Sequence, residues 1–362
     1  VVQTNAGKLR GFVVDGTYTF HGIKYADAKR FQMPQPVAPW EGIRDALSYG
    51  YVSPILNRET ASGEVKIPHR YWPKDENCQY LNVWTQSLDP QAKRPVMVWL
   101  HGGGFRDGSS IEHVAYDGEN LSRFGDVVVV TVNHRLNILG YLDLSPYGEK
   151  YWNSGNAGNA DLVASLQWVH DNIAQFGGDP ENVTIFGQSG GGGKVSSLMQ
   201  TPAANGLFQK GIIMSGVYNG TLCPEKPDSR PLVQAMLQEL GLAEEDIEQL
   251  ETLPYEALAE AYKKVSPAIQ EKGGYVGCVP IPNEYYPGGP RVVGFTPHAR
   301  TIPVLVGTVI GEMCTFGPGL PDRRTRSRED QLTYLRKFLG DKTEELVPLF
   351  EECYPGRPIT DL

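Results

Sequence analysis

Two glycine-rich motifs contain the residues of this sequence that could do chemistry. In the first, Gly187–Gly191 (GQSGG), Ser189 follows the apolar run Val183–Phe186 and precedes a helix-compatible stretch. This order of strand, serine and helix is typical of a nucleophile elbow, because glycines permit the tight turn that exposes the hydroxyl above a sheet. The free N–H groups at the start of the following helix would also favour an oxyanion there.

The same glycines suggest two nucleotide-binding interpretations, and both fail on the spacing. A phosphate-binding loop needs GxxxxGK followed by Ser or Thr, but Gln188 stands at the first glycine position and Val195 follows Lys194. A dinucleotide-binding GxGxxG is never completed, because Val195 or Ser196 stands at its last position. Taken alone, the first motif still allows a flexible turn with an incidental serine.

The second motif, His101–Phe105 (HGGGF), directly follows the apolar run 95–100. Acyl transfer creates a tetrahedral oxyanion that fixed N–H donors must stabilise, and glycines let the backbone approach that oxygen. Gly103 and Gly104 are the predicted donors, and the N–H of Gly190, the residue after the serine, completes the set. Two such motifs at two strand ends favour acyl transfer over an incidental serine.

Apolar strands alternate with helices from residue 95 onward. Continuous apolar runs are typical of strands buried on both faces, and the alternation predicts a mostly parallel sheet with helices on both sides. The stretch Asp161–Phe176 has apolar residues at i, i+4, i+7 and i+11, which predicts a helix facing the core. The predicted strands are 95–100, 127–132, 183–187, 211–215 and 302–308.

Four segments follow from this pattern. Residues 1–94 contain short strands and turns, residues 95–223 form the core with both motifs, and residues 301–362 contain the last strand and further helices at 328–339 and 343–350. Residues 224–300 interrupt the alternation with helical stretches at 231–240, 244–253 and 255–264 and a Pro/Gly-rich loop. They form either a cap over the site or a solvated decoration that never touches a substrate.

Composition excludes several classes of function. The chain has 362 residues, 40% hydrophobic, and 33 basic against 42 acidic residues leave a net charge of −9, which argues against nucleic-acid or membrane binding. Five cysteines without a CxxC pair indicate neither a zinc site nor a dense disulfide framework. We expect no other metal and no cofactor. A cytoplasmic, reducing location is expected, although a chain that begins at Val1 also allows secretion.

With both motifs and several further stretches, the sequence resembles the type-B carboxylesterases, the α/β-hydrolases that include cholinesterases and bacterial p-nitrobenzyl-type esterases. The resemblance implies the α/β-hydrolase fold with a helical cap, Ser189 as nucleophile, an oxyanion hole of Gly103, Gly104 and Gly190, and a structural ion pair between Arg30 and Glu76. A bacterial, intracellular type fits best. The matching stretches are 20–26, Arg30-Phe31, Pro39-Trp40, 76–84, 101–105, 132–136, 155–158, 176–180 and 186–190.

The resemblance also predicts the triad acid. The family places its carboxylate after the strand that corresponds to 302–308, which points to Glu312 rather than to a surface glutamate. Its role would be to orient the imidazole and stabilise the imidazolium. The sequence departs from the family at Gly311, where Asp is usual, and at Gly190, where Ala is common; we expect the latter change only to remove a side chain.

The triad base is the largest departure. All seven histidines precede Glu312, whereas the fold orders its triad as Ser, acid, His. His101 belongs to the oxyanion turn, His134 replaces a family tyrosine and His170 falls on the core-helix pattern, so each is expected to be structural. We therefore expect residues 1–362 to be the N-terminal portion of one longer domain, in which the C-terminal remainder supplies the histidine.

The combined pattern predicts a serine carboxylic-ester hydrolase that acts on a small-molecule ester through an acyl-enzyme. Two alternatives stay open. One is a cholinesterase-like interaction domain without catalysis, which the missing histidine favours and Ser189, HGGG and Glu312 oppose. The other is an amidase or thioesterase with the same site and a different leaving group.

Overall fold

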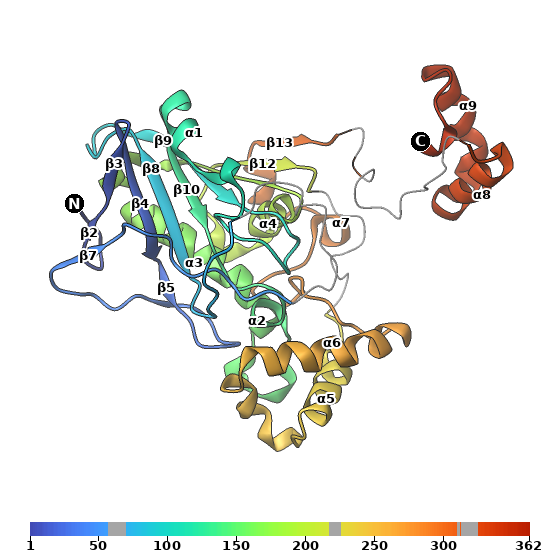
Figure 1. Ribbon diagram of the computed structural model, residues 1–362, viewed down its shortest axis with the longest axis horizontal. Coiled ribbons are helices and arrows are strands. Elements are labelled where there is room, and N and C mark those ends of the chain that lie inside the picture. Colours follow the sequence, from blue (N-terminus) through green and yellow to red (C-terminus); the bar gives the residue numbers. More distant parts are fainter. Residues whose placement is uncertain (57–69, 217–225, 310–311, 313–324) are drawn as a thin grey trace. The chain divides into compact units, whose positions relative to one another are not determined.

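The computed structural model describes residues 1–56, 70–216, 226–309, 312 and 325–362 (Figure 1). The chain divides into two compact units, Val1–Val309 and Ile310–Leu362, and each unit is described by itself. Glu312 falls in the second unit, whereas the other predicted site residues fall in the first.

The first unit is built on an eight-stranded sheet with the strand order β13-β12-β11-β9-β10-β8-β4-β3. The five strands from β9 to β13 run parallel, while β3, β4 and β8 pair antiparallel. The predicted, mostly parallel sheet is therefore confirmed. The strands are β3 (Phe12–Val14), β4 (Thr17–Lys24), β8 (Tyr80–Thr85), β9 (Arg94–Leu100), β10 (Val128–Val132), β11 (Gly178–Gln188), β12 (Lys210–Met214) and β13 (Val304–Gly307).

Short strands before residue 50 form two small additional sheets. One contains β1 (Val2–Gln3), β2 (Lys8–Arg10) and β7 (Ile43–Asp45), and the other pairs β5 (Ala26–Asp27) with β6 (Gln35–Pro36). This agrees with a lead-in of short strands and turns in the first 94 residues.

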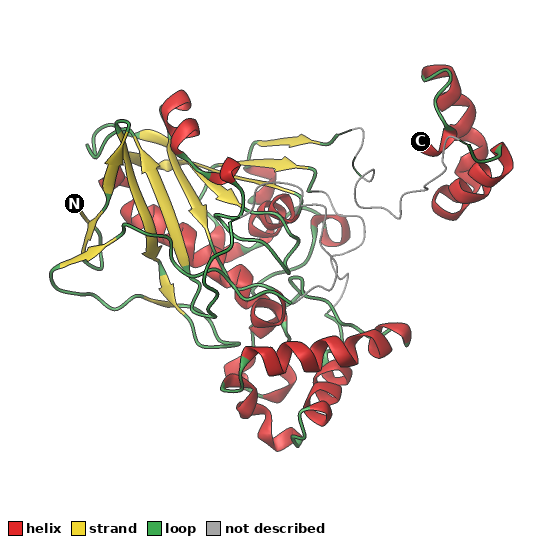
Figure 2. Ribbon diagram, viewed as in Figure 1, coloured by secondary structure: helices red, strands yellow, loops and turns green. Residues whose placement is uncertain are grey.

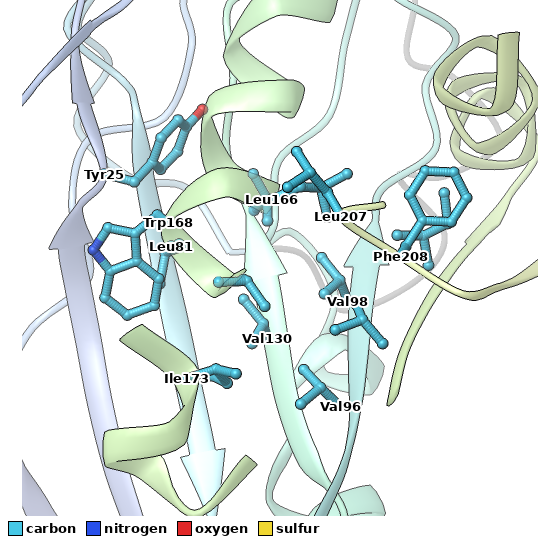
Figure 3. Packing of buried hydrophobic residues seen from close by; sticks show 14 of the residues in the cluster. Tyr25, Leu81, Val96, Val98, Val130, Leu166, Trp168, Ile173, Leu207 and Phe208 are labelled. Carbon is cyan, nitrogen blue, oxygen red and sulfur yellow. The ribbon is translucent and has the colours of Figure 1, made fainter. Parts of the chain in front are cut away.

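Helices lie against the central sheet (Figure 2), and their buried apolar residues form one cluster with those of the strands. The helix α3 (Ala157–Asn172) continues as a 3-10 turn, η6 (Ile173–Phe176), and its Leu166 and Ile173 are buried with Val98 and Val130 of the sheet (Figure 3). The helices α1 (Glu119–Gly125) and α4 (Gly190–Gln200) also contact strands of this sheet, while α2 (Asn137–Tyr141) packs against α3.

The prediction that His170 lies on the core face of this helix is wrong. Its side chain is 41% exposed, and its ring Nδ1 lies 2.9 Å from a carboxylate oxygen of Asp171. His170 follows the buried Val169 by one residue, which is about 100° around the helix, and therefore points away from the core stripe.

The predicted cap contains α5 (Arg230–Glu239), the 3-10 segment η8 (Glu244–Glu251) and α6 (Tyr255–Glu271), which lie together beyond the strand layer (Figure 2). The middle segment was expected as a helix but forms a 3-10 helix. Apolar residues of all three pack in one cluster with Phe105 and Tyr141. The cap is thus joined to the segment that directly follows Gly103 and Gly104. A further short helix, α7 (Pro290–Val293), lies in the loop beyond it.

The strand β13 departs from the expectation of a fully buried run. Val304, Leu305 and Val306 are 37%, 67% and 52% exposed, whereas every residue of β10 is buried. The cause is position, because in the described part of the chain β13 is an edge strand with β12 as its neighbour.

The second unit contains α8 (Arg328–Leu339) and α9 (Thr343–Cys353), in agreement with the predicted helices. The hydroxyl of Ser327 accepts a hydrogen bond from the backbone N–H of Asp330 and so caps α8. Leu335, Val347 and Ile359 form a small core. Across the residues described in both units, no helix is long and apolar enough to span a membrane.

Candidate active site

Ser189 lies at the point where β11 ends and α4 begins. Its backbone φ of 56° and ψ of −122° are unusual for a residue with a side chain. The backbone N–H of Ser189 donates to the carbonyl of Met214 at 2.9 Å, and its carbonyl accepts from Gly193 at 3.1 Å. Hydrogen bonds on both sides thus hold the strained turn, which has the geometry expected of a nucleophile elbow.

The glycines on either side of Ser189 are required by close backbone contacts. A Cβ atom added to Gly191 would lie 2.0 Å from the carbonyl oxygen of Leu100, at the end of β9. A Cβ atom added to Gly187 would lie 2.4 Å from the carbonyl carbon of Gly191. The first turn of α4 therefore rests directly on the end of β9, from which the second motif leaves.

The second motif forms a tight loop after β9, which we call the oxyanion loop (101–108). Gly103 and Gly104 have φ values of +83° and +64°, a region that favours glycine. The carbonyl of Gly103 accepts hydrogen bonds from the N–H groups of Arg106 (3.3 Å) and Asp107 (3.0 Å), so the loop folds back on itself.

The oxyanion loop lies beside Ser189, the predicted nucleophile. A Cβ atom added to Gly102 would lie 3.7 Å from the Cβ atom of Ser189. One added to Gly190 would lie 2.3 Å from the backbone nitrogen of Gly104. Gly190 was expected to differ from the family's alanine only by a missing side chain, but the structure leaves no room for a methyl group there.

Lys194 is a component of this site that sequence reasoning missed. It lies on α4, is fully buried, and its Nζ donates to the carbonyl oxygen of His101 at 2.7 Å. Burial lowers the pKa of Lys194 to about 7, although the carboxylates of Glu112 and Asp107 act to raise it. The available signal was a lysine five residues after Ser189, within the helix-compatible stretch and next to the apolar Val195.

His101 and His134 are buried beside this lysine. Their rings stack with centroids 5.3 Å apart, and each Nδ1 lies within hydrogen-bonding distance of a neighbouring backbone carbonyl. Burial, followed by the charge of Lys194, holds the pKa of both imidazoles well below 6.5. Both rings are therefore neutral near pH 7, which agrees with the structural role expected for them.

Glu312 lies in a turn of the second unit and is half-buried. Residues 310–311 and 313–324, which flank it, lie outside the described residues. Its assignment as the triad acid stays a prediction.

Two ion pairs support the region around the site. Arg30 and Glu76 form the bidentate pair that was predicted, and Arg30 Nη1 also donates to the carbonyls of Leu250 (2.6 Å) and Leu253 (2.7 Å). The second pair, between Arg135 and Asp161, is almost completely buried and was not predicted.

Two pockets lie near the site residues, one beside the helix α4 and one beside the Arg30–Glu76 ion pair. An apolar pocket of about 240 Å³ lies between the α4 residues Gly193 and Met199 and the β13 residues Val304 and Val306. A larger, polar pocket of about 540 Å³ lies at Arg30, Glu76 and the cap helix α6. Within the described ranges, no group of three or more His, Cys, Asp or Glu side chains is placed to hold a metal ion.

Comparisons with known proteins agree with this architecture. The model of the carboxylesterase family matches residues 1–348. The chain is 37% identical over 360 residues to the para-nitrobenzyl esterase of Bacillus subtilis, covering 98% of this chain and 70% of that protein. It is 34% identical over 384 residues to human carboxylesterase 3, covering 98% of this chain and 63% of the human protein.

Solved structures give the same picture. An esterase from the anaerobe Clostridium hathewayi, described as hydrolysing aliphatic aromatic polyesters, is 60% identical with a TM-score of 0.89, over 100% of this chain and 72% of that one. The carboxylesterase Est55 of Geobacillus stearothermophilus is 33% identical with a TM-score of 0.78 and the same coverage. The chain thus spans 63% to 72% of the length of these four relatives. With its nucleophile-elbow geometry and mostly parallel sheet, it belongs to the carboxylesterase family of α/β-hydrolases, whose members hydrolyse carboxylic esters.

Proposed function

We propose that this chain carries the nucleophile and the oxyanion hole of a serine carboxylic-ester hydrolase. The observation that supports this most strongly is the contact between two motifs that are far apart in the sequence. The oxyanion loop lies against the strained turn of Ser189, with the Cβ position of Gly102 only 3.7 Å from the Cβ atom of the serine. Acyl transfer needs this combination of nucleophile and backbone donors.

The mechanism proceeds through an acyl-enzyme. Ser189 Oγ attacks the ester carbonyl carbon, its proton passes to a base, and the carbonyl oxygen becomes an oxyanion beside the N–H groups of Gly103, Gly104 and Gly190. Collapse of the intermediate breaks the bond to the alcohol, which takes the proton from the base. Water then repeats the sequence and releases the acid.

The base is proposed to be a histidine outside residues 1–362, oriented through its Nδ1 by Glu312. Three of the six described histidines are poorly placed to act as this base, because His101 and His134 are buried rings with lowered pKa values and His170 is on the exposed face of α3. The C-terminal remainder of the protein would then complete the triad.

The substrates to test first are small esters with aromatic groups. The C. hathewayi esterase, 60% identical, is described as acting on aliphatic aromatic polyesters. The apolar pocket beside α4 offers one surface of suitable character for an aromatic or alkyl group.

The proposed location is a reducing compartment. Cys78 and Cys278 are buried free thiols and Cys353 is an exposed one. The remaining two, Cys223 and Cys314, lie outside the described residues. We expect non-reducing peptide mapping of the purified protein to detect no disulfide bonds.

The testing experiment compares the complete protein with its Ser189→Ala variant on a p-nitrophenyl ester. We expect kcat to fall by about 10⁶-fold while the far-UV circular dichroism is unchanged, since protease triads lose activity on that scale. Residues 1–362 alone should be inactive between about pH 5 and pH 9, where an imidazole base works. A complete wild-type protein without esterase activity would favour the interaction-domain alternative.

A further inference from the structure

Lys194 is a buried cation that the mechanism above does not use. It lies on α4 five residues after Ser189, and its side chain is fully enclosed. Its Nζ donates a 2.7 Å hydrogen bond to the carbonyl of His101, the residue between β9 and the oxyanion glycines. The hydrogen bond therefore joins the helix of the nucleophile to the first residue of the oxyanion loop.

The ammonium group is surrounded by that loop. It lies 6.0 Å from the centre of the Phe105 ring, a distance that allows cation–π attraction. Asp107, in the loop, and Glu112, just after it, are the carboxylates that act on it electrostatically. One Glu112 oxygen accepts from the N–H of Ser109 at 3.3 Å, so this carboxylate is itself fixed at the end of the loop.

A buried cation is expensive unless its partners are well placed, and a hydrophobic residue of similar volume is often as good or better for stability. Most partners of Lys194 belong to the short segment from His101 to Glu112. The contacts of Lys194 therefore stabilise one arrangement of this segment rather than the core in general.

We propose that Lys194 is a positioning residue for catalysis: its ammonium binds the His101 carbonyl and holds the Gly103 and Gly104 N–H groups in register with Ser189. The inference rests on the proposed esterase function. Three consecutive glycines have little conformational preference of their own, so the loop needs an external anchor. An anchor on α4 moves with the nucleophile and keeps the two halves of the site together.

The consequence for catalysis is a requirement for the charged form of Lys194. Burial places the pKa of its ammonium at about 7. The other titratable groups around it are His101 and His134, whose pKa values burial holds well below 6.5, and the carboxyl groups of Asp107 and Glu112, which act to raise the pKa of Lys194. Loss of the proton weakens the attraction to both carboxylates and to Phe105, and so loosens the loop.

Activity should therefore have two limbs of opposite sign. It rises as the triad imidazole loses its proton near pH ~6.5, and it falls as Lys194 loses its proton at slightly higher pH. A residue that only supported the fold would give no such alkaline limb in kcat.

The test uses the complete protein with the variants Lys194→Met and Lys194→Arg. Lys210→Met is the matched control, because Lys210 is exposed on β12 and bonds the side chain of Asn182. We expect Lys194→Met to lower kcat by roughly 10²-fold, the cost of one misplaced oxyanion donor, with little change in KM. Lys194→Arg keeps its charge, so it should retain more activity than the Met variant and lose the alkaline limb. Lys210→Met should match wild type in both respects.

Two results would overturn the proposal while leaving the esterase function intact. One is a Lys194→Met variant with kcat within about threefold of wild type, far less than a displaced donor costs. The other is an alkaline limb that persists unchanged in Lys194→Arg.

If the wild-type protein has no Ser189-dependent esterase activity at all, the proposed function fails first and this proposal fails with it. Circular dichroism of each variant separates these results from misfolding, and if the Met variant does not fold, the Arg profile alone decides.

Discussion

A Cβ atom on Gly190 would lie 2.3 Å from the backbone nitrogen of Gly104. The residue after the proposed nucleophile and the second proposed oxyanion donor are therefore in direct backbone contact, although 86 positions separate them in the sequence. Such a contact leaves no room for a side chain, and it makes the geometry of the oxyanion hole depend on two glycines at once.

Gly190→Ala should impair catalysis while leaving the fold intact. The methyl group would push Gly104 away from the serine, so we expect kcat to fall by about 10-fold or more, as misplaced oxyanion donors cost about 10²–10³. Gly125→Ala is the control, since its Cβ would be 3.4 Å from the nearest atom, an ordinary contact. Steady-state kinetics of an aryl ester measure both. Unchanged kcat in Gly190→Ala would show that this contact is not part of the working site.

Substitutions at the two oxyanion glycines should differ in severity. A Cβ atom on Gly103 would lie 2.4 Å from the carbonyl oxygen of Asp107, whereas one on Gly104 has its nearest neighbour 3.9 Å away. Gly103→Ala must therefore distort the loop, and kcat should fall by roughly 10²–10³. Gly104→Ala is opposed mainly by its positive φ and should lose less. Equal losses, or none, would contradict the described loop geometry.

Lys194 should also give the protein a characteristic dependence of stability on pH. Its pKa falls from 10.5 to about 7 on folding, so between these values the unfolded chain holds a proton that the folded chain releases. Stability consequently increases as pH rises through this window, by up to about 1.4 kcal/mol per pH unit. Below about pH 7 Lys194 is protonated in both states, and the cost of burying its charge lowers the free energy of unfolding in full.

Urea unfolding of wild type and Lys194→Met at several pH values between about pH 7 and pH 9 gives the free energy of unfolding of each protein as a function of pH. The difference between the two slopes of free energy against pH measures this effect. The upper limit avoids the buried Cys78 thiol, whose pKa is raised well above 9.0 and which acts in the opposite direction. Parallel slopes would show that Lys194 is not a buried cation with a lowered pKa.

The ion pair between Arg30 and Glu76 should matter for the cap. The Arg30 side chain is 7% exposed and also donates to one carbonyl in η8 and one just after it, so Glu76→Ala leaves a buried charge without its carboxylate partner. We expect a loss of roughly 3 kcal/mol in the free energy of unfolding. The exposed pair of Arg10 and Asp45 is the control, and Asp45→Ala should change the melting temperature little. Similar losses in both variants would mean that burial does not distinguish the pairs.

Local sequence patterns predicted much of the fold. The apolar runs located β9, β10, β11 and β12, and the spacing of Leu162, Leu166, Val169 and Ile173 located α3. Both glycine motifs were placed correctly at strand ends, because a strand that ends in glycines carries its own turn signal. The last strand was found, but its exposure was not, because periodicity does not reveal which strand lies at a sheet edge.

What the sequence could not predict are contacts between distant segments. The bond from Lys194 to His101 joins residues 93 positions apart and leaves no local pattern. The same is true of Gly190 with Gly104, where the absent side chain gains meaning only from the loop that crosses it. The burial of Arg135 with Asp161 likewise depends on how α3 packs.

We propose that Ser189 forms the covalent intermediate, and mass spectrometric mapping of an organophosphonate adduct on the complete protein tests this directly. The phosphonate mimics the tetrahedral intermediate and remains bound to the attacking oxygen. We predict one adduct, on Ser189, which forms in step with the loss of esterase activity and is absent from Ser189→Ala. An adduct on any other residue, or complete inactivation without modification of Ser189, would contradict the account.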